Sequence, residues 1–232
     1  MRIIPTSHST IFFWEDLIFL EAALLADDAT EALAAPVTAT VDQFMPTLHR
    51  DLDTRRGLIQ SSARSSVGDW RIDFGLRGLH SAALHLVKQD RQAPAFTNLF
   101  NTHIGAVVRH ALKRQVEIAR DLVDKLSLPL YPAEFRTAQV AALEPLITRG
   151  GQAIEERRQA ELARASGRID VRTWKEEANA VRLSIYAALL SLAAQNGRGK
   201  AWAESFFKKK SAAGGRDDDD EPVDSGELPD EV

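Results

Sequence analysis

The sequence predicts an all-α protein: a helical bundle followed by a disordered acidic tail. Apolar residues recur at helical spacing in nearly every segment before residue 210, and alternating runs of β-branched residues are missing. The last 22 residues hold nine acidic side chains and one Arg. A segment of that composition buries too little apolar surface to offset its ordering entropy. We therefore predict a helical body over residues 1–210 and a disordered tail over residues 211–232.

The composition narrows the protein's class. A chain of 232 residues is long enough for one large or two small domains. It has no Cys, which excludes disulfides, thiolate nucleophiles and iron–sulfur clusters and fits a reducing compartment. The apolar stretch at 11–26 contains three acidic residues, unlike a signal peptide or a membrane span. We expect a cytoplasmic protein without a transmembrane segment, and the abundance of Ala and Arg suggests a bacterial source.

Local signals divide the first half of the body into four helices. The first begins after Ser9 or Thr10 and ends at about residue 34, because Pro36 stops it. The second covers about 37–63, with Ser65 to Gly68 as the next break. Asp69 is a candidate N-cap for the third helix, which Pro94 interrupts. The fourth runs from there to about residue 126.

Three further helices are predicted in the second half. Pro129 and Pro132 form a rigid connector, so the fifth helix begins at about residue 133 and ends before Gly167. The segment from Thr173 to Glu176 has the form of a capping box and begins the sixth helix. A short basic helix follows over about 200–210.

An internal repeat is the most informative pattern in the sequence. Landmarks of the first half recur in the same order in the second, with offsets that rise slowly from 99 to 106 residues. Trp70 matches Trp174, and the pair Phe96 and Phe100 matches Trp202 and Phe206. We predict a duplicated helical unit of roughly 100 residues, over about 10–105 and 106–210. The alternative is that any chain rich in Ala and Leu resembles itself somewhere.

The familiar catalytic and metal motifs are missing. None of the six His residues has a Glu three positions before it, which excludes the Glu-x-x-His motif of carboxylate-bridged di-iron bundles. There is no Gly-rich phosphate loop and no Gly-x-Ser-x-Gly nucleophile motif. We predict no catalytic, cofactor-binding or metal-binding residue.

The segment before the tail combines aromatic and basic residues. Two interpretations stay open: Trp202 and Phe206 pack on the bundle while the lysines reach outward, or the segment docks a protein, an anionic membrane or a nucleic acid. The candidate partner-binding residues are Lys200, Phe207, Lys208, Lys209, Lys210, Asp217, Asp218, Asp219 and Asp220.

These patterns favour a structural or adaptor protein that binds a protein partner or forms a homo-oligomer. The first alternative is a nucleic-acid-associated factor that uses Lys208 to Lys210, with the acidic tail competing for the basic patch. The second alternative is an enzyme without a recognisable signature.

Overall fold

The computed structural model describes residues 3–208, and over that range the prediction of an all-α protein is confirmed. The predicted acidic tail lies outside the described residues. The helices, with the 3-10 turn η1, are α1 (Thr10–Leu25), η1 (Glu31–Leu33), α2 (Ala35–Asp42), α3 (Phe44–Leu86), α4 (Pro94–Leu99), α5 (Ile104–Val107), α6 (Leu112–Leu126), α7 (Ala133–Gln195) and α8 (Lys200–Glu204).

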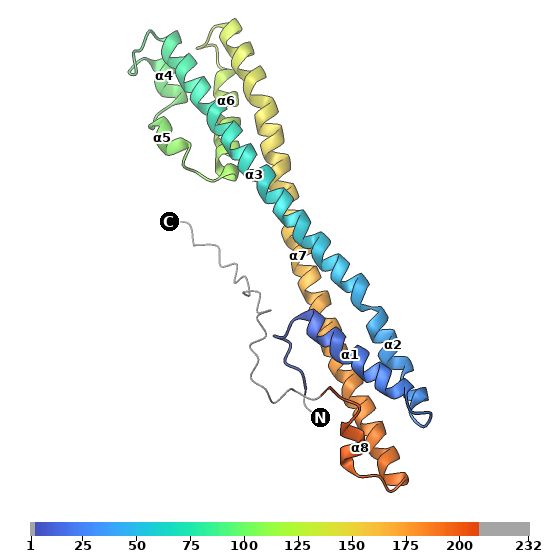
Figure 1. Cartoon of the computed structure of the whole chain (residues 1–232). Coiled ribbons are helices and arrows are strands. Elements are labelled where there is room, and N and C mark those ends of the chain that lie inside the picture. The colour runs from blue at the N-terminus through green and yellow to red at the C-terminus, as the bar shows by residue number, and fades with distance from the viewer. Residues whose placement is uncertain (1–2, 209–232) are drawn as a thin grey trace.

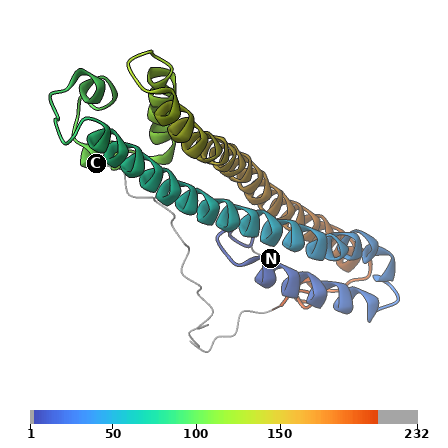
Figure 2. The same ribbon diagram turned by 90° about the horizontal axis from the view of Figure 1, so that it is seen from above.

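Two long antiparallel helices form the axis of the molecule (Figures 1 and 2). Helix α3 has 43 residues and α7 has 63, so they extend about 65 Å and 95 Å at 1.5 Å per residue. Helices α4, α5 and α6 lie at one end of this rod, and α1, α2 and α8 lie at the other (Figure 1). Among residues 3–208, the middle of the rod consists of α3 and α7 alone (Figure 1).

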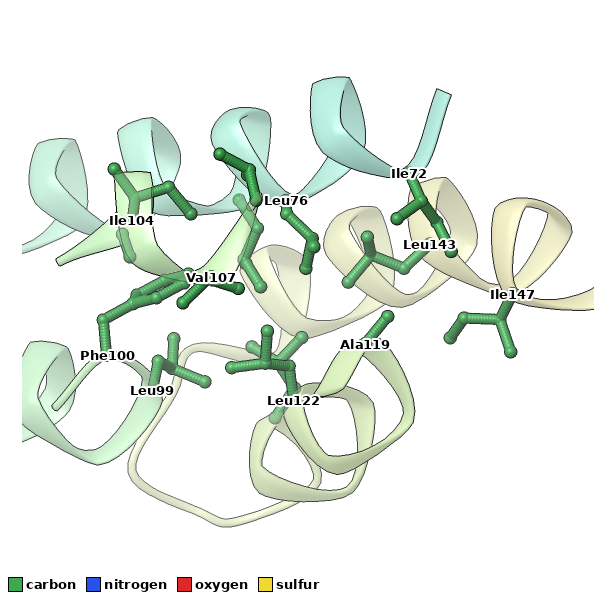
Figure 3. Packing of buried hydrophobic residues seen from close by; sticks show 14 of the residues in the cluster. Ile72, Leu76, Leu99, Phe100, Ile104, Val107, Ala119, Leu122, Leu143 and Ile147 are labelled. Carbon is green, nitrogen blue, oxygen red and sulfur yellow. The ribbon is translucent and has the colours of Figure 1, made fainter. Parts of the chain in front are cut away.

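One hydrophobic core fills the end that carries α6. Ile72 and Leu76 of α3 meet Leu143 of α7, and Leu122 of α6 closes the cluster from the third side (Figure 3). The short helices α4 and α5 add Leu99 and Ile104, among others, where the chain returns from α3 to α6. Amphipathic α6 is thus held by burial of its apolar face.

A second core fills the opposite end and contains a buried ion pair. Four α1 side chains spaced like a helical stripe, from Phe13 to Leu24, are fully buried against α2 and α7. Within this core Arg182 Nε donates to Asp16 Oδ2 over 2.6 Å, and both side chains are less than 10% exposed. The pair joins α1 to α7 across 166 residues of sequence.

Between the two cores, α3 and α7 meet through small side chains. Ser61 and Ser65 of α3 are buried, as are Ala153 and Gly167 of α7. A Cβ atom on Gly167 would lie 2.7 Å from Oγ1 of Thr54, so glycine permits the close approach. Three ion pairs also cross this interface: Arg164 with Asp51, Arg50 with Asp170, and Arg64 with Glu156.

Several predicted helix ends are wrong because packing overrides local signals. Helix α3 continues through Ser65 to Gly68, so Asp69 is not an N-cap. Helix α7 continues through Gly167, so the Thr173 capping box does not exist. A glycine inside a helix lowers helix stability by only about 1 kcal/mol relative to alanine. Burial of the neighbouring side chains in the α3–α7 contact contributes more stability than this.

The first and fourth predicted helices are shorter than expected. Helix α1 begins after Ser9, as predicted, and the Ser9 hydroxyl accepts a hydrogen bond from the Phe12 amide at 3.2 Å. It ends at Leu25 rather than near residue 34. Just beyond this end, the hydroxyl of buried Thr30 donates a hydrogen bond to the Leu24 carbonyl over 2.8 Å. The fourth helix is divided into α4, α5 and α6, and the buried Gln115 amide holds the intervening loop through two carbonyl groups.

The buried ion pair gives the first prediction. Replacing Asp16 by Asn leaves Arg182 buried without its carboxylate and is expected to lower the free energy of unfolding by about 3–5 kcal/mol. The matched control is Asp170→Asn, which breaks the exposed Arg50–Asp170 pair and should cost about 0–1 kcal/mol. Urea unfolding measures both values, and equal losses would contradict the importance given to the buried pair.

Two helical glycines give the second prediction. A Cβ on Gly150 would lie 2.7 Å from Val116 Cγ2 and 3.3 Å from Ile72 Cδ1, both in the core, whereas nothing lies within 4 Å at Gly57. Gly57→Ala should therefore raise stability by about 0.5–1 kcal/mol through helix propensity. Gly150→Ala brings the same gain in helix propensity, but it should lower the melting temperature because its Cβ would clash with Val116. A stabilising Gly150→Ala would show that the α6 contact is looser than described.

Candidate functional site

The outward side of α3 carries an exposed apolar stripe. Its six residues are between 48 and 68% exposed, and we call them the outer stripe of α3: Met45, Leu52, Ile59, Val67, Trp70 and Phe74. They follow one another at steps of seven, seven, eight, three and four residues. At 100° per residue they fall within a band of about 80° on the helix. They therefore lie on one side of α3, where His49 and Arg56 lie between them.

The outer stripe lies opposite the face that α3 buries. The buried α3 residues at the α6 end, Ile72, Leu76 and Leu79, project about 180° away from it. Helix α3 thus has two apolar faces, and only one is covered by the described part of the chain. Apolar residues on two sides are typical of a helix that is covered on both sides.

The two largest members of the stripe are also its most exposed. Trp70 is 66% exposed and Phe74 is 68% exposed, and their rings stack with centroids 5.9 Å apart and planes 19° apart. Aromatic residues of this kind are enriched in the cores of protein interfaces and among their energetic hot spots. Their joint exposure makes this the region where we place the candidate site.

Unpaired arginines border the stripe. Within residues 3–208, no carboxylate lies within 4.0 Å of the guanidinium groups of Arg55, Arg56 or Arg71, all of which are exposed. In contrast, Arg50 and Arg64 of the same helix are paired with acidic residues of α7. Arg55, Arg56 and Arg71 thus place positive charge on and beside the outer stripe, on a side of α3 that also carries the exposed Asp53.

Two acidic residues near the stripe do not neutralise it. Asp69 and Asp73 are partly buried, and the Gln115 side chain of α6 lies beside Asp73. Burial raises the pKa of both carboxyl groups, and their mutual repulsion adds to the increase at Asp69. Arg77 opposes the increase at Asp73. These carboxyl groups therefore interact within the α6 end rather than with Arg55, Arg56 or Arg71.

A shallow groove of about 380 Å³ adjoins the stripe at Val67. Its apolar floor includes Leu146 and Ala153 of α7, and its rim carries Arg71 and Arg149. The lining residues offer no hydroxyl or thiol nucleophile and no His. Among residues 3–208, no cluster of three or more His, Asp or Glu side chains suits a metal ion. The arrangement is suited to binding an anionic or amphipathic surface.

The structure separates the partner-binding residues predicted from the sequence. Lys200 Nζ lies 3.3 Å from Glu204, and Lys208 Nζ lies 3.3 Å from Glu15, so each of these lysines has an acidic neighbour. Phe207, predicted as a partner contact, is a core residue: it is 7% exposed and packs edge-on against Tyr186. Lys209, Lys210 and Asp217 to Asp220 lie outside the described residues.

The sequence contains a signal for the stripe that the predicted helix boundaries hide. Met45, Leu52 and Ile59 repeat every seven residues, which is typical of a helix-docking face. The predicted break at residues 65–68 separates them from Trp70 and Phe74. Once α3 is continuous, both segments share one face.

Comparison with known proteins gives no further assignment: no protein-family model, curated protein or solved structure matches the chain. In the described part of the chain, no helix combines the length and the apolar character needed to cross a membrane.

The exposure of the stripe gives the third prediction. Trp70→Ser should change the free energy of unfolding by no more than about 0.5 kcal/mol, because the ring has few neighbours. Leu76→Ala, on the buried side of the same helix, should cost about 2–5 kcal/mol. Chemical denaturation compares the two. A large loss for Trp70→Ser would mean that the ring supports the fold instead of a partner.

Proposed function

We propose that this protein is a helical structural or adaptor protein that binds a protein partner along the outer stripe of α3. The observation that carries the proposal is the exposed Trp70–Phe74 stack at the end of a stripe that runs back to Met45. Monomeric soluble proteins rarely leave so long an apolar surface uncovered unless it is an interaction site.

The size of the stripe is sufficient for a specific interface. Each of its six side chains exposes on the order of 100 Å², so the stripe offers roughly 600 Å². A standard protein interface buries about 800 Å² on each partner. The bordering arginines and the groove at Val67 supply the rest of such an area.

The spacing and charge of the stripe favour an amphipathic helix with acidic flanks as the partner. Side chains at intervals of seven residues match the contacts of a helix lying along α3. Carboxylates on that helix would pair with Arg55, Arg56 and Arg71, and guanidinium–carboxylate pairs are among the stronger charged hydrogen bonds.

A nucleic-acid-associated factor is the second candidate, and the observation that favours it is the same row of arginines beside an exposed Trp. Arginines contact phosphates, and aromatic rings stack on bases. The seven-residue spacing of Met45, Leu52 and Ile59 has no role in such binding, so we rank a nucleic-acid partner below a protein partner. An enzyme is the third candidate, and the groove offers little chemistry for it.

Two related proposals concern the origin and location of the protein. A duplicated unit of about 100 residues is supported by the ends of the long helices: the Gln89 amide donates to the Leu84 carbonyl and the Arg198 amide to the Ala193 carbonyl. Each end leads to a short helix with aromatic residues. Trp174 is 2% exposed, so its match with Trp70 is not supported. A cytoplasmic location is proposed from the composition.

Site-specific photo-crosslinking tests the proposed function. Benzoylphenylalanine in place of Val67 should crosslink one defined protein in cells of the source organism, and Trp70→Ser should reduce the yield at least tenfold. The control is the same probe in place of Ile169, an exposed apolar residue of α7. Equal products from both positions would refute docking on α3, and crosslinked nucleic acid would favour the second candidate.

A further inference from the structure

The inference concerns how the outer stripe of α3 is covered when no partner is bound, and it rests on the proposed function of that stripe. We propose that the acidic tail of the same chain, residues 211–232, docks across the outer stripe of α3 and that a partner must displace it. Three observations favour the tail as the occupant: its negative charge, the length of chain after Lys208, and the ion pairs that other basic groups already make.

Charge complementarity favours the tail as the occupant. The tail has nine acidic residues, five of them in the uninterrupted run Asp217 to Glu221, and one Arg. The net charge of the tail is −8, while residues 1–210 carry +4. Arg55, Arg56 and Arg71 are exposed cations of this body without a carboxylate within 4.0 Å among residues 3–208.

Several other basic groups at the surface are already paired with acidic residues. Lys200 and Lys208 lie beside Glu204 and Glu15. On α7, Arg158 is paired with Glu155, and this exposed pair lowers the Glu155 pKa to about 2. An acidic segment would have to compete with these carboxylates, whereas Arg55, Arg56 and Arg71 have none within 4.0 Å among residues 3–208.

The chain is long enough to reach the stripe. The described chain ends at Lys208, which pairs with Glu15 of α1. The neighbouring Trp14 stacks on Phe44, the first residue of α3, with ring centroids 5.0 Å apart. The described chain therefore ends near the N-terminal end of α3. The run at Asp217 begins nine residues later, within about 30 Å, and the 24 residues after Lys208 span up to about 80 Å.

The intramolecular geometry makes a weak contact sufficient. A covalent tether of this length gives the tail an effective concentration in the millimolar range. Apolar residues among the acids, such as Val223 and Leu228, would lie on the aromatic part of the stripe. Such docking would shield the exposed rings and would be weakened by salt, because it rests on charges at the surface.

Paramagnetic relaxation in the full-length protein tests the proposal. The chain has no Cys, so Ser225→Cys carries a single spin label without interference. We expect at least a twofold loss of amide signal at Ile59, Val67 and Trp70, and little loss at Ile169 and Leu183 of α7. Raising NaCl from about 50 mM to about 500 mM should restore the α3 signals. Equal losses on both helices would overturn the proposal.

Charge reversal provides the matched control. Arg55→Glu, Arg56→Glu and Arg71→Glu together should release the tail, and replacing each residue from Asp217 to Asp220 by Lys in that variant should restore the signal loss. A misfolded variant would not be rescued, and unchanged losses in the triple variant would refute the pairing. Docking of the tail within one chain is distinguished from docking between two chains by mixing isotope-labelled chains with spin-labelled chains. Signal losses that arise only between chains would overturn docking within one chain.

The two proposals fail in different ways. If the tail shows no contact with α3 while the probe at Val67 still captures its partner, only the tail proposal is wrong. If the tail contacts α3 but no protein crosslinks at Val67 even after deletion of residues 211–232, the proposed function is wrong. Deletion of the tail should raise the crosslinking yield at Val67 severalfold when both are right.

Discussion

The antiparallel contact between α3 and α7 is the constraint on which the rest of the structure depends. Small side chains such as Ser61, Ser65 and Gly167 bring the two helices close together over their middle section. Because α3 gives one face to this contact, its opposite face has no neighbour within the described chain. The exposed stripe is a direct consequence of a rod that is only two helices thick at its centre.

The two ends of the rod keep the stripe rigid. At one end α6 closes a core over α3 and α7, and at the other α1 is fixed to α7 by the Asp16–Arg182 pair. Between them, ion pairs such as Arg164 with Asp51 hold α3 against α7. A partner would therefore meet side chains whose backbone is already ordered, which lowers the entropy lost on binding.

The distribution of charge explains why α3, rather than α7, is the candidate surface. On α7, Arg157, Arg158 and Arg172 each pair with a Glu of the same helix, three or four residues away. On α3, Arg55 and Arg56 have no carboxylate within 4.0 Å among residues 3–208. The overall net charge of −4 combines a tail of net charge −8 with residues 1–210 of net charge +4.

The sequence by itself determined the helical class and the start of the first helix after Ser9, because both depend on local periodicity and hydrogen bonding. The seven-residue spacing that begins at Met45 is present in the sequence, but the predicted helix boundaries hid it. Only the tertiary structure decided that α3 and α7 are continuous, since burial outweighs the small local cost of a glycine. It also decided that Phe207 is buried while Trp70 is exposed. Periodicity shows that a helix has an apolar face, but which face is covered depends on segments more than 100 residues away.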